Sequence, residues 1–160
     1  YFNKFKNTWA HGDLIEINDH GGVVIYGRSD ATLNPGGVRI GTAEIYRIVE
    51  SLPEVDDSLV IGQEWNNDQR IILFLKLNKT KKLTNKLSDV IKQTIKTSLS
   101  PRHVPSLIFQ VEDIPYTISG KKVELAVKKI IEGDSVVNQD ALSNPESLDL
   151  YRSIPELSSR

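Results

Sequence analysis

The sequence predicts an α+β fold: a small domain with a central three-stranded sheet covered by helices, preceded by a β-hairpin. The chain has 160 residues, which is room for one domain, or for one domain and a piece of another. Its composition, 39% hydrophobic and 26% charged residues, is that of a globular protein. After the hairpin, segments with helical and strand periodicity follow one another in the order helix, strand, strand, helix, strand, helix.

Composition excludes several kinds of partner and cofactor. The 20 Lys and Arg residues nearly balance the 21 Asp and Glu residues, so no overall field would attract nucleic acid or an anionic membrane. No run approaches the roughly 18 apolar residues that span a bilayer, and we expect a soluble protein. The absence of cysteine excludes disulfides and thiolate metal sites, and it fits a reducing compartment such as the cytoplasm, where we expect the protein. The spacing of His11, His20 and His103 matches no metal-binding pattern.

The first strong pattern is the β-hairpin. Residues 14–17 and 23–26 are β-prone runs, and the turn formers between them include glycines that accept positive φ. Residues 27–41 contain the string Asn34-Pro35-Gly36-Gly37 and are too rich in turn formers for a helix or a central strand. We expect this segment to be a loop or a hinge.

Helical periodicity begins after this loop. Apolar residues recur at helical spacing in Ile45, Ile48, Val49 and Leu52. Thr42 is the predicted N-cap, and Glu44 suits the positive end of the helix dipole in the first turn. The helix is predicted to end before Pro53.

Two strands, a second helix and a third strand come next. Residues 59–61 and 71–75 are predicted to pair antiparallel, and the second of these runs is apolar on both faces, as expected of a strand covered on two sides. Residues 84–99 carry one apolar stripe, and Pro101 ends this helix. Residues 107–111 supply the third strand.

A third helix and an ordered tail are predicted to complete the chain. The helix is indicated by the apolar residues Val123, Ala126, Val127, Ile130 and Ile131. Glu124 and Lys128 have the spacing of an ion pair on its solvent face. Residues 134–142 are polar and are predicted to cross the surface, and Asn144 before Pro145 is the predicted cap of a short helix.

Five positions could carry chemistry, and each also has an ordinary structural explanation. A Gly-Lys pair before a helix suggests a phosphate loop, but the rest of the Walker A pattern is missing, so Lys121 is left as a lysine at the tip of a turn. Asp13 suits the vicinal hydroxyls of a sugar or is an acid at a strand end, and Arg28 suits a phosphate or caps the hairpin. Gly36 and Gly37 form a plain turn or let the backbone approach a narrow ligand.

Four motifs agree in order and spacing with a known family. They are His11-Gly12-Asp13, Gly27-Arg28-Ser29-Asp30, residues 34–45 and residues 115–121. Together they resemble the closing third of adenylate-forming enzymes, the acyl-CoA synthetase superfamily, over essentially the whole chain. Residues 27–35, 102–106, 120–124 and 143–157 resemble the acetoacetate-using branch of that superfamily. The chain departs from the usual superfamily pattern at His11, Ala31 and Lys122, the last of which stands where an aliphatic residue is usual.

The resemblance implies an ATP-dependent acid–CoA ligase. Such enzymes use ATP with Mg²⁺ to convert a carboxylate to an acyl adenylate, release pyrophosphate, and then transfer the acyl group to the thiol of CoA. The substrates expected from the acetoacetate-using branch are acetoacetate, ATP and CoA, and the products are acetoacetyl-CoA, AMP and pyrophosphate. Two alternatives stay open: a synthetase for another short-chain acid, and a non-catalytic, stand-alone module of the same fold.

The resemblance also implies a division of the chain. Residues 1–29 would be the C-terminal remnant of a large N-terminal adenylation domain. Residues 30–160 would be the mobile C-terminal lid domain, with a C-terminal extension at about 134–160. The chain contains no Met and starts at Tyr1, as expected of a fragment. We expect the fragment alone to be inactive and to hold no tightly bound cofactor, because the ATP-phosphate loop and the acid pocket belong to the N-terminal domain, its partner in the same chain.

Individual roles follow from the same resemblance. Lys121 would be the catalytic residue, acting electrostatically rather than as a base during adenylation. Asp13 and Arg28 would bind the nucleotide, and Asp30 would be the hinge. The residues expected to bind CoA are Gly36, Gly37, Arg39 and Lys96, with a solvated place on the helix surface as the alternative for Lys96. No metal-ligating residue is expected in this portion.

Overall fold

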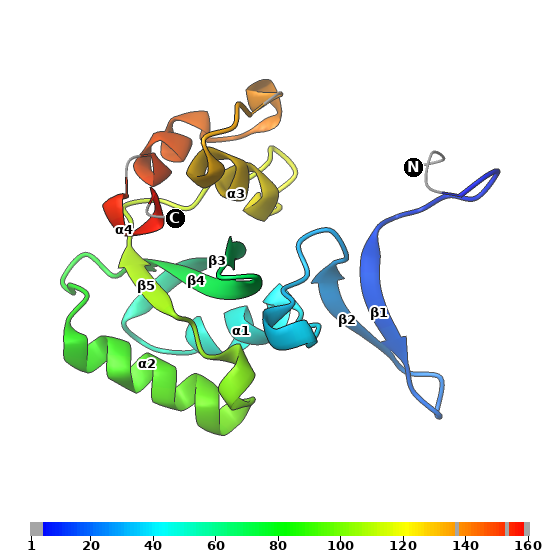
Figure 1. The fold of residues 1–160 in the computed structure, drawn as a ribbon, viewed down its shortest axis with the longest axis horizontal. Helices are drawn as coiled ribbons and strands as arrows, with labels where there is room; N and C mark the ends of the chain where they lie inside the picture. Colours follow the sequence, from blue (N-terminus) through cyan, green and yellow to red (C-terminus); the bar gives the residue numbers. More distant parts are fainter. Residues whose placement is uncertain (1–4, 137, 153, 159–160) are drawn as a thin grey trace.

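The computed structural model describes residues 5–136, 138–152 and 154–158, and it shows a small α+β domain with a projecting hairpin (Figure 1). Strands β3 (Val55–Trp65), β4 (Asp68–Leu77) and β5 (Leu107–Gln110) form one sheet in the order β3-β4-β5. Strands β3 and β4 are antiparallel, whereas β4 and β5 are parallel. The predicted three-stranded sheet is confirmed, and the two long strands extend beyond the predicted runs.

Helices cover both faces of this sheet. Helices α1 (Thr42–Val49) and α2 (Asn85–Ser98) lie against one face, and α3 (Glu124–Glu132) lies against the other (Figure 1). Alternate residues of β4 point to opposite faces: Leu73 packs with the α1 and α2 side, and Phe74 packs with the α3 side. Both side chains are fully buried, so β4 is apolar on both faces, as predicted.

The start of α1 differs from the prediction, because its N-cap is Gly41 rather than Thr42. The Glu44 carboxylate accepts a hydrogen bond of 3.0 Å from the backbone N–H of Gly41 and thus satisfies a donor at the helix start. A side chain at Gly41 would collide with the backbone of Tyr26 in the hairpin, so a capping side chain has no room there. Thr42 is buried within the first turn.

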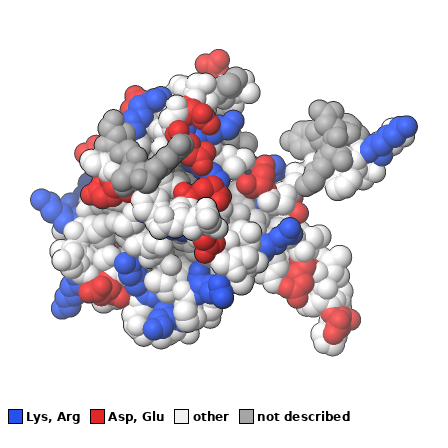
Figure 2. Space-filling view, viewed as in Figure 1, with Lys and Arg blue, Asp and Glu red and all other residues white. Residues whose placement is uncertain are grey.

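The hairpin consists of β1 (Asp13–Ile17) and β2 (Val23–Arg28), and it projects from the domain, which β2 contacts at the start of α1 (Figure 1). Its exposed apolar residues are Ile15, Ile17, Val23, Val24 and Ile25. Among the described residues, no helix is both long enough and apolar enough to cross a membrane. Basic and acidic side chains are interspersed over the visible face of the molecule, in line with the near balance of charges (Figure 2).

The chain after α3 returns across the α3 side of the sheet. It forms the short helices η3 (Gln139–Ala141), η4 (Pro145–Tyr151) and α4 (Pro155–Ser158). Tyr151 is buried edge-on against Phe74, with ring centroids 4.9 Å apart. The predicted short helix at Pro145 is a 3-10 helix, and the side chain of Asn144 does not cap it.

The predicted solvent-facing pair of Glu124 and Lys128 is wrong. Glu124 accepts a hydrogen bond of 2.9 Å from the Tyr46 hydroxyl. Lys128 lies 3.8 Å from carboxylate oxygens of Glu64 and Glu132. The Glu124 carboxylate therefore binds Tyr46 on α1 instead of Lys128, the partner that local spacing predicted.

Candidate functional site

Lys121 lies on an ordered turn before α3. The backbone N–H of Thr117 donates a hydrogen bond to the Lys121 carbonyl at 2.8 Å, and the backbone N–H of Lys121 donates one to the Thr117 hydroxyl at 3.0 Å. Gly120 has φ 76°, a conformation that glycine adopts without steric cost. Among the described residues, no carboxylate lies within 4.0 Å of the exposed Lys121 ammonium, so this cation is available to a ligand.

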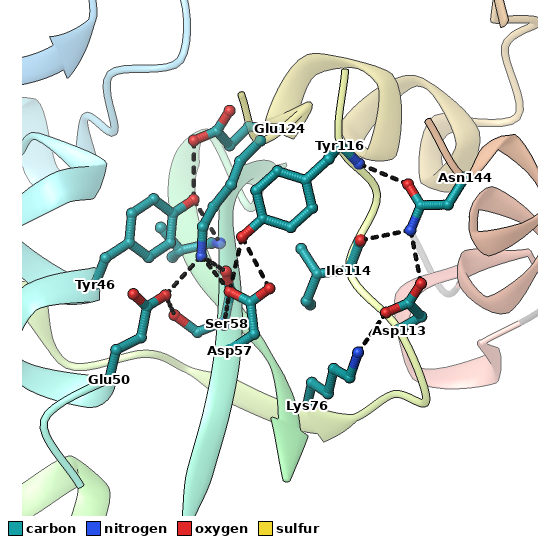
Figure 3. A network of polar contacts seen from close by, with 12 residues as sticks. Tyr46, Glu50, Asp57, Ser58, Lys76, Asp113, Ile114, Tyr116, Glu124 and Asn144 are labelled. Carbon is teal, nitrogen blue, oxygen red and sulfur yellow. Dashed lines mark hydrogen bonds and ion pairs between the residues drawn. The ribbon is translucent and has the colours of Figure 1, made fainter. Parts of the chain in front are cut away.

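The next residue, Lys122, has the opposite environment. Its ammonium donates hydrogen bonds of 2.6 Å to both Glu50 and Asp57, and a further one to the Ser58 carbonyl (Figure 3). The same nitrogen lies 4.3 Å from the ring centre of Tyr46, a cation–π contact. The side chain is only 16% exposed. Lys122 therefore anchors the end of the Lys121 turn to β3 and α1.

Two tyrosines complete this network. The Tyr116 hydroxyl donates to Asp57 at 2.8 Å, and the Tyr46 hydroxyl accepts from the backbone N–H of Val60 at 3.1 Å while it donates to Glu124 (Figure 3). Burial raises the pKa of Tyr46 well above its ordinary value, and burial followed by the Asp57 hydrogen bond does the same for the pKa of Tyr116. Burial also raises the pKa of Glu124. Both phenols stay protonated and keep donating near neutral pH.

A hollow of about 330 Å³ lies beside the Lys121 turn and brings three predicted site residues together. Arg28, Asp30 and Lys121 all line it. The Arg28 guanidinium reaches the Asp30 carboxylate with two nitrogens, at 3.1 and 3.0 Å, and donates to the His11 carbonyl at 2.9 Å. The hydrogen bonds from Arg28 lower the pKa of Asp30, so its carboxylate is charged at neutral pH.

Asp13 lies at the start of β1 and is not part of the lining of this hollow. Its carboxylate is 2.5 Å from Nδ1 of His11. The segment is tied to the residues next to the predicted hinge, because both the backbone N–H and the hydroxyl of Ser29 donate to the Gly12 carbonyl, at 2.7 and 2.8 Å. The contacts to Ser29 are thus made by the backbone of Gly12, while the Asp13 carboxylate contacts His11.

Gly36 and Gly37 form a second ordered turn, η1 (Pro35–Gly37), with φ of 57° and 77°. The Gly36 N–H donates to the Asp68 carboxylate at 2.8 Å. The N–H of Asn34 donates to the side chain of Gln69 at 2.6 Å. The residues that flank this turn, Leu33 and Ile40, belong to the core on the α1 and α2 side.

The other two residues predicted to bind CoA are exposed. Arg39 follows the glycine turn, and Lys96 lies in the last turn of α2. Helix α2 and the Lys121 turn lie on opposite sides of the sheet (Figure 1). The structure therefore groups Lys121 with Arg28 and Asp30, and keeps Lys96 apart from them. Within the described part of the chain, no group of three or more His, Asp or Glu side chains is placed to hold a metal ion.

Comparisons with known proteins test the family resemblance inferred from the sequence. No protein-family model matches the chain. It is 55% identical over 159 residues to the acetoacetyl-coenzyme A synthetase of Rhizobium meliloti (strain 1021), covering 99% of this chain and 24% of that protein. It is 56% identical over 159 residues to the acetoacetyl-CoA synthetase of Xenopus tropicalis, covering 98% of this chain and 24% of that protein.

Solved structures give the same result. The acetoacetyl-CoA synthetase of Streptomyces lividans matches with a TM-score of 0.88 and 41% identity, over 99% of this chain and 24% of that one. An acyl-CoA synthetase of Brucella canis matches with a TM-score of 0.60 and 26% identity, over 74% of this chain and 22% of that one.

The fold is that of the C-terminal domain of acyl-CoA synthetases. More specifically, the chain matches the C-terminal part of acetoacetyl-CoA synthetases along its whole length. It spans about a quarter of the length of these relatives. The resemblance inferred from the sequence, including the acetoacetate-using branch, is confirmed.

Sequence reasoning missed the residues that hold the Lys121 turn in place: Tyr46, Asp57, Tyr116, Lys122 and Asn144. One signal was present, since Lys122 stands where the superfamily usually has an aliphatic residue. A lysine at an aliphatic position indicates a side chain that is partly buried and therefore paired.

Proposed function

We propose that the chain forms the C-terminal part of an ATP-dependent acid–CoA ligase that converts acetoacetate, ATP and CoA to acetoacetyl-CoA, AMP and pyrophosphate. The observation that carries this proposal is the identity of 52 to 56% to vertebrate acetoacetyl-CoA synthetases over 98% of the chain. The exposed ammonium of Lys121, which has no ion pair among the described residues and extends from an ordered turn, supports it, because adenylation concentrates negative charge on phosphate and carboxylate oxygens.

In this proposal, residues 1–29 end a large N-terminal domain and residues 30–160 form a lid that rotates about Asp30. The projecting hairpin supports this division, because its exposed apolar side chains suit burial against another body. The N-terminal domain of the same chain is thus the main partner. It would supply the acid pocket and most contacts to ATP, which would enter with Mg²⁺ as a substrate complex.

Adenylation is the step assigned to Lys121. A carboxylate oxygen of acetoacetate attacks the α-phosphorus of ATP, and pyrophosphate leaves. The lid brings the Lys121 ammonium to the oxygens where negative charge grows, and the lysine transfers no proton. One preorganised donor of this kind contributes about 3 to 4 kcal/mol to transition-state stabilisation.

Asp13 and Arg28 are assigned to the nucleotide. Asp13 would accept hydrogen bonds from the ribose hydroxyls, and Arg28 would bind ribose or phosphate oxygens. Because the Arg28 guanidinium holds the Asp30 carboxylate with two nitrogens, a phosphate would have to share or displace that pairing. Nucleotide binding and hinge position are therefore coupled through Arg28.

The second step is assigned to the other side of the lid. After rotation about Asp30, the CoA sulfur attacks the acyl carbon and AMP leaves. Gly36, Gly37 and Arg39 would line the path of the pantetheine chain, where glycine permits a close approach of the backbone. Lys96 would pair with a CoA phosphate.

The test is Lys121→Ala in the full-length protein, with each half-reaction measured separately. Acid-dependent exchange of pyrophosphate with ATP should fall about 100- to 1,000-fold, because an electrostatic donor is lost at the reacting centre. Transfer from supplied acetoacetyl adenylate to CoA should be retained. Lys129→Ala is the matched control, since Lys129 is an exposed lysine on α3 that forms no ion pair within the described part of the chain. Equal loss in both half-reactions contradicts the assignment.

The same exchange assay tests the acid. Acetoacetate should support faster exchange than acetate. A preference for acetate would keep the ligase class and overturn the acetoacetate assignment. No exchange with any short acid would favour a non-catalytic module.

A further inference from the structure

The segment that begins with the last residue of η3 runs beside the Lys121 turn. Thr117 and Leu142 form an antiparallel bridge. The N–H of Ile118 donates to the Ala141 carbonyl at 2.9 Å, and the N–H of Ser143 donates to the Tyr116 carbonyl at 2.9 Å. Residues 141–143 therefore pair, as a short strand would, with the first part of the turn that ends in Lys121.

The side chain of Asn144 adds three contacts at the base of this turn. Its Oδ1 accepts from the backbone N–H of Tyr116 at 2.9 Å. Its Nδ2 donates to the Asp113 carboxylate at 2.6 Å and to the Ile114 carbonyl at 2.9 Å (Figure 3). One amide thus holds both the start of the turn and the loop that leads into it.

These contacts connect the turn to rigid parts of the fold. Asp113 also accepts from Lys76 of β4 at 2.7 Å, and its carbonyl accepts from the Tyr151 hydroxyl at 3.0 Å. Directly after Asn144, helix η4 buries Leu148 and Tyr151 in the core with Phe74. Asn144 therefore lies between an anchored helix and an exposed turn.

The opposite end of the turn is held by Lys122, as described above. Residues 118–121 themselves are exposed, and none of them belongs to the two core clusters of the described residues. Lys122 and the segment 141–144 thus fix the two ends, and together they set the position from which the Lys121 side chain extends. Such positioning has a large effect on rate, because a displacement of about 1 Å costs on the order of 100-fold.

We propose that residues 141–144 form a brace that holds the Lys121 turn in its reactive position, with Asn144 as a positioning residue for adenylation. This inference rests on the proposed role of Lys121. It gives a function to part of the C-terminal extension, which carries none of the predicted site residues. Asn144 makes no contact with substrate; it acts through Tyr116 and the turn.

The test is Asn144→Ala in the full-length protein, with kcat and KM measured for each half-reaction. We expect kcat for adenylation to fall about tenfold, with KM for ATP changed by less than about twofold. Transfer from supplied acyl adenylate to CoA should stay within about twofold of the parent. Gln139→Ala is the matched control, because this exposed amide lies in η3, just before residues 141–144, and its side chain makes one hydrogen bond among the described residues, of 3.4 Å to the Val136 carbonyl. Both half-reactions should be unchanged in that variant.

Asn144→Ser is the milder variant and decides the test if Asn144→Ala does not fold. Its shorter side chain keeps a hydroxyl oxygen near the Tyr116 N–H and adds no charge beside the Asp113 carboxylate, so adenylation should fall about threefold while transfer is retained. Equal loss in both half-reactions, or activity like that of Gln139→Ala, overturns the brace. If Lys121→Ala leaves adenylation intact, the proposed function itself fails. If Lys121→Ala abolishes adenylation and the Asn144 variants do not affect it, only the brace fails.

Discussion

The Lys121 turn and the glycine turn at residues 34–37 are both exposed, and both depend on glycine with positive φ. They are held in different ways. A partly buried lysine with two carboxylates, together with a neighbouring chain segment, fixes the Lys121 turn. Two side chains from the start of β4, Asp68 and Gln69, hold the glycine turn.

The difference corresponds to what each turn is proposed to do. A lysine that binds a phosphate needs a backbone held in one position and an ammonium that is available to the ligand. Lys122 fixes the backbone of the turn, and the Lys121 ammonium remains available. A turn that must approach a narrow chain closely needs backbone without side chains, and light anchoring suffices. Because the two sets of anchors share no residue, substitutions in one should affect one half-reaction and leave the other unchanged.

Among the variants that alter an anchor of either turn, Lys122→Met has the largest expected effect. This change leaves the carboxylates of Glu50 and Asp57 close together without their shared cation. Removal of one partner from a partly buried ionic group costs about 3 kcal/mol in the free energy of unfolding. Urea denaturation measures that loss, and adenylation should fall more than transfer to CoA.

Two further variants sharpen this prediction. Adding Glu50→Gln and Asp57→Asn to Lys122→Met removes the unpaired charges and should restore part of the stability. Lys129→Met, at an exposed position, should change the free energy of unfolding by less than about 0.5 kcal/mol. A similar small change for Lys122→Met would show that the network does not hold the turn.

The next effect concerns the glycine turn. Gly36→Ala requires a positive φ from a residue with a Cβ, at about 1 kcal/mol, and the new methyl group would displace the Arg102 guanidinium. We expect transfer from supplied adenylate to CoA to slow about tenfold, with adenylation retained. Gly133→Ala is the control, because Gly133 also has positive φ but has open space around it at the end of α3. A similar slowing of transfer in that variant would mean that lost stability alone explains the effect.

Local patterns in the sequence were sufficient to predict the elements of the fold. The hairpin, the three longer helices and the three strands follow from spacing and turn formers, which depend on neighbours along the chain. Lys121 was found because a Gly-Lys pair at a turn is a local pattern and because the surrounding motifs resemble a known family. The division of predicted site residues between the two sides of the sheet was not visible in the sequence.

Tertiary partners explain what the sequence did not predict. Asn144 before Pro145 has the pattern of a helix cap, but its amide instead binds Tyr116, which is 28 residues away. Glu124 has the spacing to pair with Lys128, but its carboxylate instead accepts a hydrogen bond from the hydroxyl of Tyr46, which is 78 residues away in the chain. A local sequence pattern predicts which hydrogen bonds a side chain can form, and tertiary packing determines which of them it does form.

A smaller effect is expected from Asp68→Ala. The carboxylate accepts from the N–H groups of Gly36 and Gln69, at 2.8 and 2.7 Å, and its loss leaves the glycine turn held by the Gln69 side chain. Transfer to CoA should slow about threefold, because an exposed anchor restricts a turn only weakly. Asp89→Ala, an exposed acid on α2, is the control. An effect of Asp68→Ala on adenylation as large as on transfer would break the separation of the two turns.

The smallest expected effect is a change in the pKa of Asp113. Measuring this pKa together with that of Asp68 compares one anchor of each turn. Partial burial raises the pKa of Asp113, but hydrogen bonds from Lys76 and Asn144 outweigh it and hold the pKa below its ordinary value of 3.8. The pKa of Asp68 is lowered by the N–H groups of Gly36 and Gln69. Both carboxylates therefore add stability above about pH 4 that is lost as the pH falls through their lowered pKa values.

Asn144→Ala should raise the pKa of Asp113, because one donor to its charged form is removed, and should leave the pKa of Asp68 unchanged. NMR titration of the aspartate carboxyl carbons measures both values in the same sample. The Asp68 carboxylate is the internal control, since it belongs to the other turn. A shift of both pKa values would mean that the two turns are linked through the sheet, and a shift of neither would mean that Asn144 does not hold Asp113 in solution.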